Sequence, residues 1–290
     1  MKTSPIVATC LIVLAAAPAR AANADRSRSA DVRFALSQQG EVVIPVFVGG
    51  AGPHRFLLDT GSSHTVISQS LATTLGAVPV AKAPLVTSAG SVLALVVELS
   101  DVSVGSARVE SLLATSLPPT AAGMLGDGIA GVLGQDFLSQ FNYTLDYRHS
   151  RLSWDDDGQI DKGVRLALET SHGRFLVHLP QDERCGCPVR LVPDSGANGV
   201  VLFAGTEADR LPFDATVPAI HVSTLVGDGS APGVIVRQLL VAPATLRHLP
   251  AARVVLPAGT IEDGDGLLPL SLFAIVSFRP HAGYMVVQPR

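Results

Sequence analysis

The same tripeptide pattern, an aspartate followed by a hydroxyl residue and a glycine, occurs twice in this 290-residue chain. Asp59-Thr60-Gly61 and Asp194-Ser195-Gly196 lie 135 positions apart, and each follows a short apolar stretch typical of a strand. The same spacing relates Pro53 to Pro188, Arg55 to Arg190, and Gly131-Val132-Leu133 to Gly266-Leu267-Leu268. The spacing predicts an internal duplication in which each copy presents one aspartate on a tight turn.

Two aspartates on equivalent turns indicate a particular chemistry. Two carboxyls at close range do not both ionise readily, so one keeps a proton while the other is charged. The charged carboxyl takes a proton from water, and the neutral one hydrogen-bonds the carbonyl under attack. Glycine permits the tight turn and a close approach of the partner turn, and the hydroxyl can bond across to it. We therefore predict a catalytic dyad of Asp59 and Asp194, supported by Thr60, Gly61, Ser195 and Gly196.

Both copies resemble retropepsin-type aspartic proteases of the kind found in bacteria, and the paired turns in one chain are similar to those of the bilobal pepsins. The resemblance covers roughly residues 32–290 and depends in the first copy on residues 43–46, 57–63 and 131–138. In the second copy, Pro193 precedes the aspartate and Pro269 replaces the counterpart of Gly134. The resemblance implies an all-β fold of two similar acid-protease barrels related by a pseudo-two-fold axis, and an aspartic endopeptidase without cofactor or metal. The alternative is an inactive peptide-binding module of the same fold.

Strand patterns dominate the rest of the chain. Apolar or β-branched runs bounded by turn residues predict strands at 42–48, 56–58, 93–99, 107–113, 175–179, 189–192, 233–240 and 252–256. Short helices are expected at 68–75 and 135–141. The expected organisation is a signal peptide (1–24), an N-terminal arm (25–31), a first lobe (32–154), an acidic linker (155–163) and a second lobe (164–290).

Two glycine-rich hairpin tips are candidates for flaps that cover a substrate. One contains Ser88 and Gly90, and its counterpart contains Gly227. Such tips suit lids that open for a peptide and close to exclude water. The other interpretation is that both are ordinary surface hairpins.

The N-terminus predicts export. Lys2 precedes an apolar stretch, and Ala22-Asn23-Ala24 fits a small-x-small cleavage site. Cleavage there changes the net charge from −4 to −6, because it removes Lys2 and Arg20. An acidic mature protein disfavours nucleic acid and anionic membranes as partners. We expect a periplasmic or secreted monomer, an intramolecular pseudo-dimer, acting on peptides or proteins.

Other chemistries find no support in the sequence. The histidines lack the His-Glu-x-x-His spacing, and no Gly-x-Ser-x-Gly elbow is present. After cleavage only Cys185 and Cys187 remain, and they either form a small disulfide or are two turn cysteines. A metal site would need more ligands nearby. We therefore predict no cofactor and no metal.

Overall fold

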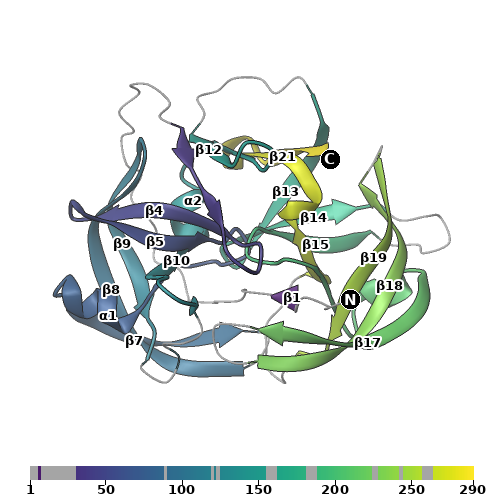
Figure 1. Ribbon diagram of the computed structural model, residues 1–290, viewed down its shortest axis with the longest axis horizontal. Helices are drawn as coiled ribbons and strands as arrows, with labels where there is room; N and C mark the ends of the chain where they lie inside the picture. Colours follow the sequence, from purple (N-terminus) through teal and green to yellow (C-terminus); the bar gives the residue numbers. More distant parts are fainter. Residues whose placement is uncertain are drawn as a thin grey trace.

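The computed structural model describes residues 6–7, 31–87, 90–118, 121, 125–154, 162–180, 188–223, 228–241, 244–256 and 264–290. Nearly all regular structure in these residues is β-strand, as expected from the sequence. Figure 1 shows two groups of strands at opposite sides, with β12 (Arg151–Trp154), β13 (Val164–Ser171) and β21 (Phe273–Arg279) between them. Within the described ranges, no helix has the length and apolar character needed to cross a membrane.

Six strands of the first half close into a barrel. They follow the order β4, β5, β10, β6, β9 and β8, and the pairing of Phe47 with Ser103 joins β4 to β8 and closes the ring. Strands β3 and β7 extend this sheet. The strands are β3 (Ala35–Leu36), β4 (Val42–Val48), β5 (Ala51–Leu58), β6 (Val66–Ile67), β7 (Pro79–Thr87), β8 (Gly90–Val104), β9 (Ala107–Ser116) and β10 (Gly131–Leu133).

The second sheet is open and has fourteen strands in the order β1-β17-β18-β19-β16-β20-β15-β14-β13-β22-β21-β11-β12-β2. Three strands of the first half, β2, β11 and β12, therefore belong to this sheet and not to the barrel, and β11 joins them to the second half by pairing with β21. The remaining strands are β1 (Ile6–Val7), β2 (Val32–Arg33), β11 (Tyr143–Asp146), β14 (Arg174–Leu179), β15 (Val189–Asp194), β16 (Val200–Phe203), β17 (Phe213–Ser223), β18 (Asp228–Val241), β19 (Ala244–Val254), β20 (Gly266–Pro269) and β22 (Tyr284–Pro289).

Helices are short and sit at turns. Ser68 begins α1 (Gln69–Thr74) as its N-cap, because its hydroxyl accepts a hydrogen bond from the Leu71 N–H at 3.1 Å. The second helix, α2 (Gln135–Leu138), is shorter than the predicted 135–141. Beyond Leu138 the backbone continues in tighter turns that bond residues three apart. The described residues also include the 3₁₀ turns η2 (Glu207–Arg210), η3 (Leu270–Leu272) and η4 (Pro280–Ala282).

One continuous core connects the barrel to the open sheet. It includes Phe56 and Leu133 from the barrel, and Tyr143 and Phe278 from the open sheet. The rings of Tyr143 and Phe278 stack with centroids 4.8 Å apart. Strand β5 is buried on both faces, since Phe56 and Leu58 contact this core while Leu57 belongs to a second cluster. Burial on both faces explains the unbroken apolar run before Asp59.

Each predicted strand overlaps a strand of the structure, although β19 ends at Val254, two residues before the expected end. The sheets do not divide where the expected lobes divide, because β2, β11 and β12 cross into the second sheet. Several expectations fall outside the described residues: most of the signal segment and the N-terminal arm, linker positions 155–161, Cys185, Cys187, Ser88 and Gly227.

Candidate active site

Asp59 lies directly after β5, in a turn that fixes its carboxyl. Its backbone N–H donates to the Leu133 carbonyl at 3.0 Å, which ties the turn to the parallel strand β10. Its Oδ1 accepts hydrogen bonds from the N–H groups of Gly61 at 2.9 Å and Ser62 at 3.1 Å. The side chain is fully buried. One carboxyl oxygen is therefore held by the turn, and the other points away from it.

Asp194 has the same surroundings at the end of β15. Its Oδ1 accepts from the N–H groups of Gly196 at 2.7 Å and Ala197 at 3.0 Å. Strand β15 pairs in parallel with β20, and Leu191 lies opposite Gly266 just as Phe56 lies opposite Gly131 in the barrel. Leu191 is 135 positions after Phe56, and Gly266 is 135 positions after Gly131. The spacing seen in the sequence therefore relates equivalent strand pairings in the two halves.

Four hydrogen bonds join the two aspartate turns reciprocally. The Thr60 N–H donates to Ser195 Oγ, and the Ser195 N–H donates to Thr60 Oγ1, each at 3.0 Å. The Thr60 hydroxyl donates to the Pro193 carbonyl, and the Ser195 hydroxyl to the Leu58 carbonyl, each at 2.7 Å. Each hydroxyl thus bonds the backbone directly before the opposite aspartate. Pro193 serves here as an acceptor, so its missing N–H leaves this network complete.

The two turns approach so closely that a side chain at Gly196 would displace the Asp59 carboxyl. A β-carbon added to Gly196 would lie 2.9 Å from Asp59 Cγ and 3.0 Å from each of its carboxyl oxygens. The carboxyl would have to shift to relieve these contacts. The backbone that follows one aspartate is therefore packed directly against the carboxyl of the other.

Burial raises the pKa values of both carboxyls above the ordinary value of an aspartate. Burial, the charge of Asp194 and a hydrogen bond with that residue raise the pKa of Asp59 well above its ordinary value. Burial raises the pKa of Asp194 to about 6, against the lowering effect of its hydrogen bonds. The Oδ2 atoms of both residues are buried and accept no hydrogen bond from a described group. A proton on one carboxyl supplies the donor that the other lacks.

Two residues beside the site were not singled out in the sequence. Gln135 Nε2 donates to the Thr60 carbonyl at 2.8 Å. The Asp136 carboxylate accepts from the Thr65 N–H at 2.8 Å and from its hydroxyl at 2.7 Å, and burial raises the Asp136 pKa to about 6. Both residues come just after Gly134, within the 131–138 stretch that resembles the aspartic proteases. That resemblance was the one feature of the sequence that could have pointed to them. Through these hydrogen bonds, the start of α2 holds the segment from Thr60 to Thr65 in place.

The expected flap positions lie on two long hairpins. Thr87 pairs with Gly90 at the tip of the β7–β8 hairpin, and Ser223 pairs with Asp228 near the tip of β17–β18. Ser88 and Gly227 lie outside the described residues. In Figure 1 the two hairpins run from opposite sides toward the middle of the lower edge.

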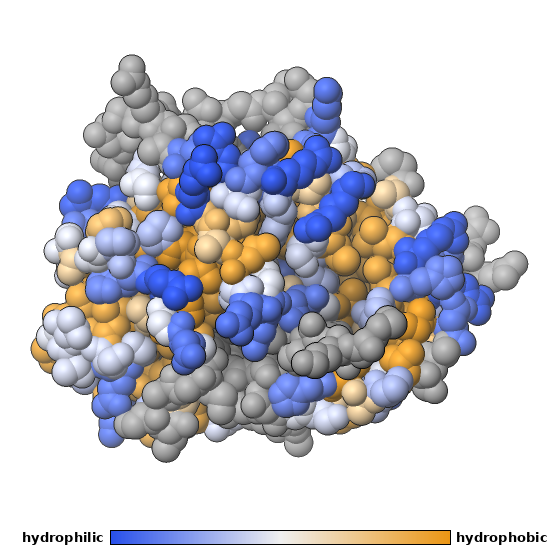
Figure 2. All heavy atoms as spheres, in the orientation of Figure 1, coloured by the Kyte–Doolittle hydropathy of each residue, from blue (hydrophilic) through white to orange (hydrophobic). Residues whose placement is uncertain are grey.

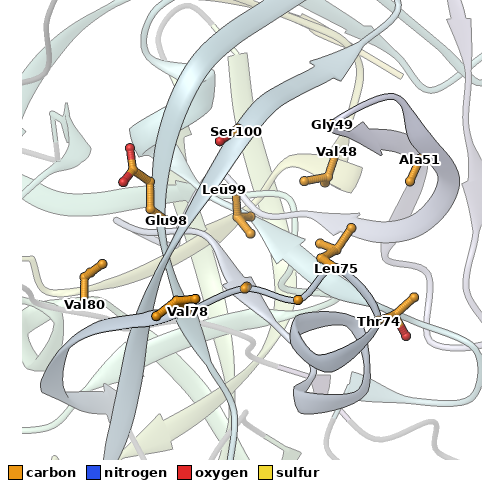
Figure 3. Close-up of a pocket in the computed structure, with 12 residues that line it drawn as sticks. Val48, Gly49, Ala51, Thr74, Leu75, Val78, Val80, Glu98, Leu99 and Ser100 are labelled. Atoms are coloured by element: carbon orange, nitrogen blue, oxygen red, sulfur yellow. The ribbon is translucent and has the colours of Figure 1, made fainter.

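A cavity of about 580 Å³ lies elsewhere on the barrel, between the β4–β5 turn, the end of α1 and β8 (Figure 3). Polar and apolar groups share its wall about equally, with Val48, Leu75 and Leu99 among the apolar side chains. Apolar side chains are also exposed on this side of the molecule in Figure 2. Glu98 is the one titratable residue of the wall, and its carboxylate accepts from the Ser111 hydroxyl. Neither aspartate of the dyad lines this cavity, so it offers no paired acid and base.

Comparisons with known proteins find a family match within the first half of the chain. Residues 44–137 match the family model described as aspartyl protease. A crystal structure of a retropepsin-like aspartic protease from Rickettsia conorii is similar at 20% sequence identity, with 44% of this chain and 92% of that chain covered and a TM-score of 0.33. None of the curated proteins compared with this chain matches it. The segment that carries Asp59, Gly134 and α2 is thus a match to the aspartyl protease family.

Proposed function

We propose that this protein is an aspartic endopeptidase whose catalytic residues are Asp59 and Asp194. The observation that carries the proposal is the pair of buried carboxyls, each anchored through Oδ1 and each leaving Oδ2 for the other or for a reacting group. The reciprocal bonds of Thr60 and Ser195 hold the two carboxyls in a fixed relation. A fixed, desolvated pair of acids with one shared proton is suited to activating water.

The second half supplies its share of the site through a pseudo-two-fold arrangement, which we also propose. The β11–β12 hairpin pairs Asp146 with Arg151, and β21–β22 pairs Arg279 with Tyr284 in the same pattern. With these hairpins aligned, Thr144 corresponds to Ser277, and these two residues pair with each other. The Thr144 hydroxyl donates to Ser277 Oγ at 2.8 Å. A two-fold axis through this pair relates β11 to β21 and Asp59 to Asp194.

The reaction proceeds without a covalent enzyme intermediate. The ionised carboxyl removes a proton from water as the water oxygen attacks the peptide carbonyl carbon. The protonated carboxyl donates its proton to the carbonyl oxygen, which gives a neutral gem-diol and exchanges the protonation states of the two acids. In collapse, the newly protonated acid gives its proton to the leaving nitrogen as the C–N bond breaks. The other acid recovers its proton from a gem-diol hydroxyl, so the enzyme returns to its starting state.

We further propose that the substrate is an extended peptide. The long β7–β8 and β17–β18 hairpins offer backbone groups with which an extended segment can pair. Because both aspartates are in one chain, a monomer suffices. The apolar N-terminal segment supports export of the protein to the periplasm or the medium.

The test is cleavage of a mixed fluorogenic peptide library by wild type and by Asp59→Asn and Asp194→Asn variants. Each substitution should lower kcat by about 10²- to 10⁴-fold, because an amide neither carries the charge nor shares the proton. Asp127→Asn, which removes an exposed carboxylate, is the matched control and should retain activity. Loss in Asp59→Asn alone would refute the intramolecular dyad. Peptide binding by a wild type that never cleaves would establish the inactive binding module instead.

A further inference from the structure

Two buried residues of opposite charge occupy equivalent places beside the two aspartates. Glu41 is 7% exposed and Arg174 is 3% exposed. Each directly follows a glycine with positive φ, Gly40 at 90° and Gly173 at 76°, in the turn that leads into β4 or β14. The two turns are therefore built alike, but they place an anion in one half and a cation in the other.

Each charged residue lies at the same end of a strand pair as its own aspartate. In the barrel, the pairing of β4 with β5 ends at Val43 and Leu57, two residues after Glu41 and two before Asp59. In the second half, the pairing of β14 with β15 ends at Val177 and Leu191, three residues after Arg174 and three before Asp194. Each side chain is near enough for its charge to act on the carboxyl of that aspartate. A constant spacing of 135 does not align the two, because Glu41 and Arg174 differ by 133 positions.

We propose that Glu41 and Arg174 are positioning residues that give the dyad a fixed polarity: Asp59 holds the shared proton and Asp194 is the ionised base. This inference rests on the proposed function and specifies the role of each acid within it. An anion beside Asp59 disfavours a second negative charge there, and a cation beside Asp194 favours one. Asp194 then takes the proton from water, and Asp59 donates to the peptide carbonyl oxygen.

The charges acting on the two carboxyls agree with this direction. Burial, the partner aspartate and the backbone hydrogen bonds have the larger effects on the two pKa values. Beyond them, the charge of Glu41 raises the pKa of Asp59, and the charge of Arg174 lowers the pKa of Asp194. Burial, and then the charge of Asp194, raises the Tyr147 pKa against the lowering effect of Arg290, so its phenol stays neutral wherever the dyad titrates. Glu41 and Arg174 are therefore charged side chains outside the pair that act in opposite directions on its two acids.

The test is the pH profile of kcat/KM for Arg174→Gln, Arg174→Lys and Glu41→Gln. Loss of the cation should move the acidic limb to higher pH by about half a unit or more, which is about a threefold loss of kcat/KM on that limb. Loss of the anion should move the alkaline limb to lower pH. Arg174→Lys keeps the charge and should restore the wild-type acidic limb, which a purely structural role would not predict. Arg108→Gln, which removes an exposed cation paired with Asp101, should shift neither limb.

A second measurement needs no peptidase activity, so it separates this inference from the proposed function. With carbon-13 in the aspartate carboxyls, NMR follows both dyad residues, which Asp59→Asn and Asp194→Asn assign. In the wild type, Asp194 should ionise at lower pH than Asp59, and the gap should narrow in Arg174→Gln and in Glu41→Gln. If Arg174→Gln fails to fold, Glu41→Gln still tests the polarity. The proposal would be overturned if Asp59 ionised at lower pH than Asp194. It would also be overturned if folded Arg174→Gln and Glu41→Gln variants both kept the wild-type pH profile of kcat/KM.

Discussion

The reciprocal hydroxyl network makes a quantitative prediction for Ser195→Ala. The substitution removes two hydrogen bonds, one received from the Thr60 N–H and one donated to the Leu58 carbonyl. Ser195 is 3% exposed and Thr60 is fully buried, so water does not readily replace these bonds. Each bond contributes about 1 kcal/mol net, and a buried group left unpaired costs about 1–3 kcal/mol. We expect a loss of about 2–4 kcal/mol in the free energy of unfolding.

The Ser195→Ala variant should also lose activity, because the lost hydrogen bonds hold the two carboxyls in their relative positions. A displacement of about 1 Å at the dyad costs about 10²-fold in kcat. The measurements are urea unfolding and peptide cleavage under conditions where the variant is fully folded.

Thr206→Ala is the matched control, because its hydroxyl also accepts one N–H, that of Ala208, and donates to one carbonyl, that of Phe203. Those bonds lie within one turn of the second half, so this variant should lose stability and keep kcat. A folded Ser195→Ala variant with wild-type kcat would refute the idea that these bonds align the dyad.

Three further predictions follow from the same site, and one from the N-terminus. Folding raises the Asp194 pKa from its ordinary 3.8 to about 6, so the folded state binds more protons between those pH values and stability falls as pH rises through them. Asp194→Asn should therefore recover about 3 kcal/mol of the free energy of unfolding above pH 6, measured by unfolding at a series of pH values. Gly196→Ala should displace the Asp59 carboxyl and lower kcat about 10²-fold, whereas Gly205→Ala, where a β-carbon meets nothing within 4 Å, should leave kcat unchanged despite its positive φ. Gly90→Val, at the tip of the β7–β8 hairpin, should lower turnover more than thermal stability, and full activity would contradict a lid role. N-terminal sequencing of the exported protein should begin near Asp25, and recovery of intact Met1 from the cytosol would contradict export.

The parts of this structure that were predictable from sequence are the parts fixed by local pattern. Apolar runs before each aspartate identify β5 and β15, since those strands are buried and short. The spacing of 135 positions predicts equivalent turns, and the structure keeps that spacing in the pairing of β5 with β10 and of β15 with β20. Ser68 before an apolar stretch predicts the start of α1.

Long-range pairing was not predictable in the same way. Strands β11 and β12 belong to the first half of the sequence, yet they lie in the open sheet, where β11 pairs with β21 and β12 with β2. The alternation of apolar and polar residues along a strand does not identify the strand it pairs with, because any exposed sheet edge offers the same backbone groups. The bonds of Gln135 and Asp136 to Thr60 and Thr65 also join residues about 70 positions apart, and only the fold brings them together.

The equivalence of Glu41 and Arg174 was hidden for a different reason. The second half has two residues more than the first between this charged position and its aspartate turn, so a fixed spacing of 135 misaligns them. The strand pairings align them, because Glu41 comes just before β4, which pairs with β5, and Arg174 begins β14, which pairs with β15. A sequence comparison at constant spacing thus finds the symmetric backbone and overlooks the asymmetric charges.

That combination has a consequence for mechanism. Two identical subunits related by a two-fold axis place the same residues around both carboxyls, so neither acid is distinguished before substrate binds. Two halves of one chain can keep the symmetric backbone bonds of Thr60 and Ser195 while their buried charges diverge. Here the divergence places the charge of Glu41 near Asp59 and that of Arg174 near Asp194. The backbone symmetry brings the acids together, and the charge asymmetry assigns the proton to one of them, so the direction of proton transfer is set before a peptide enters the site.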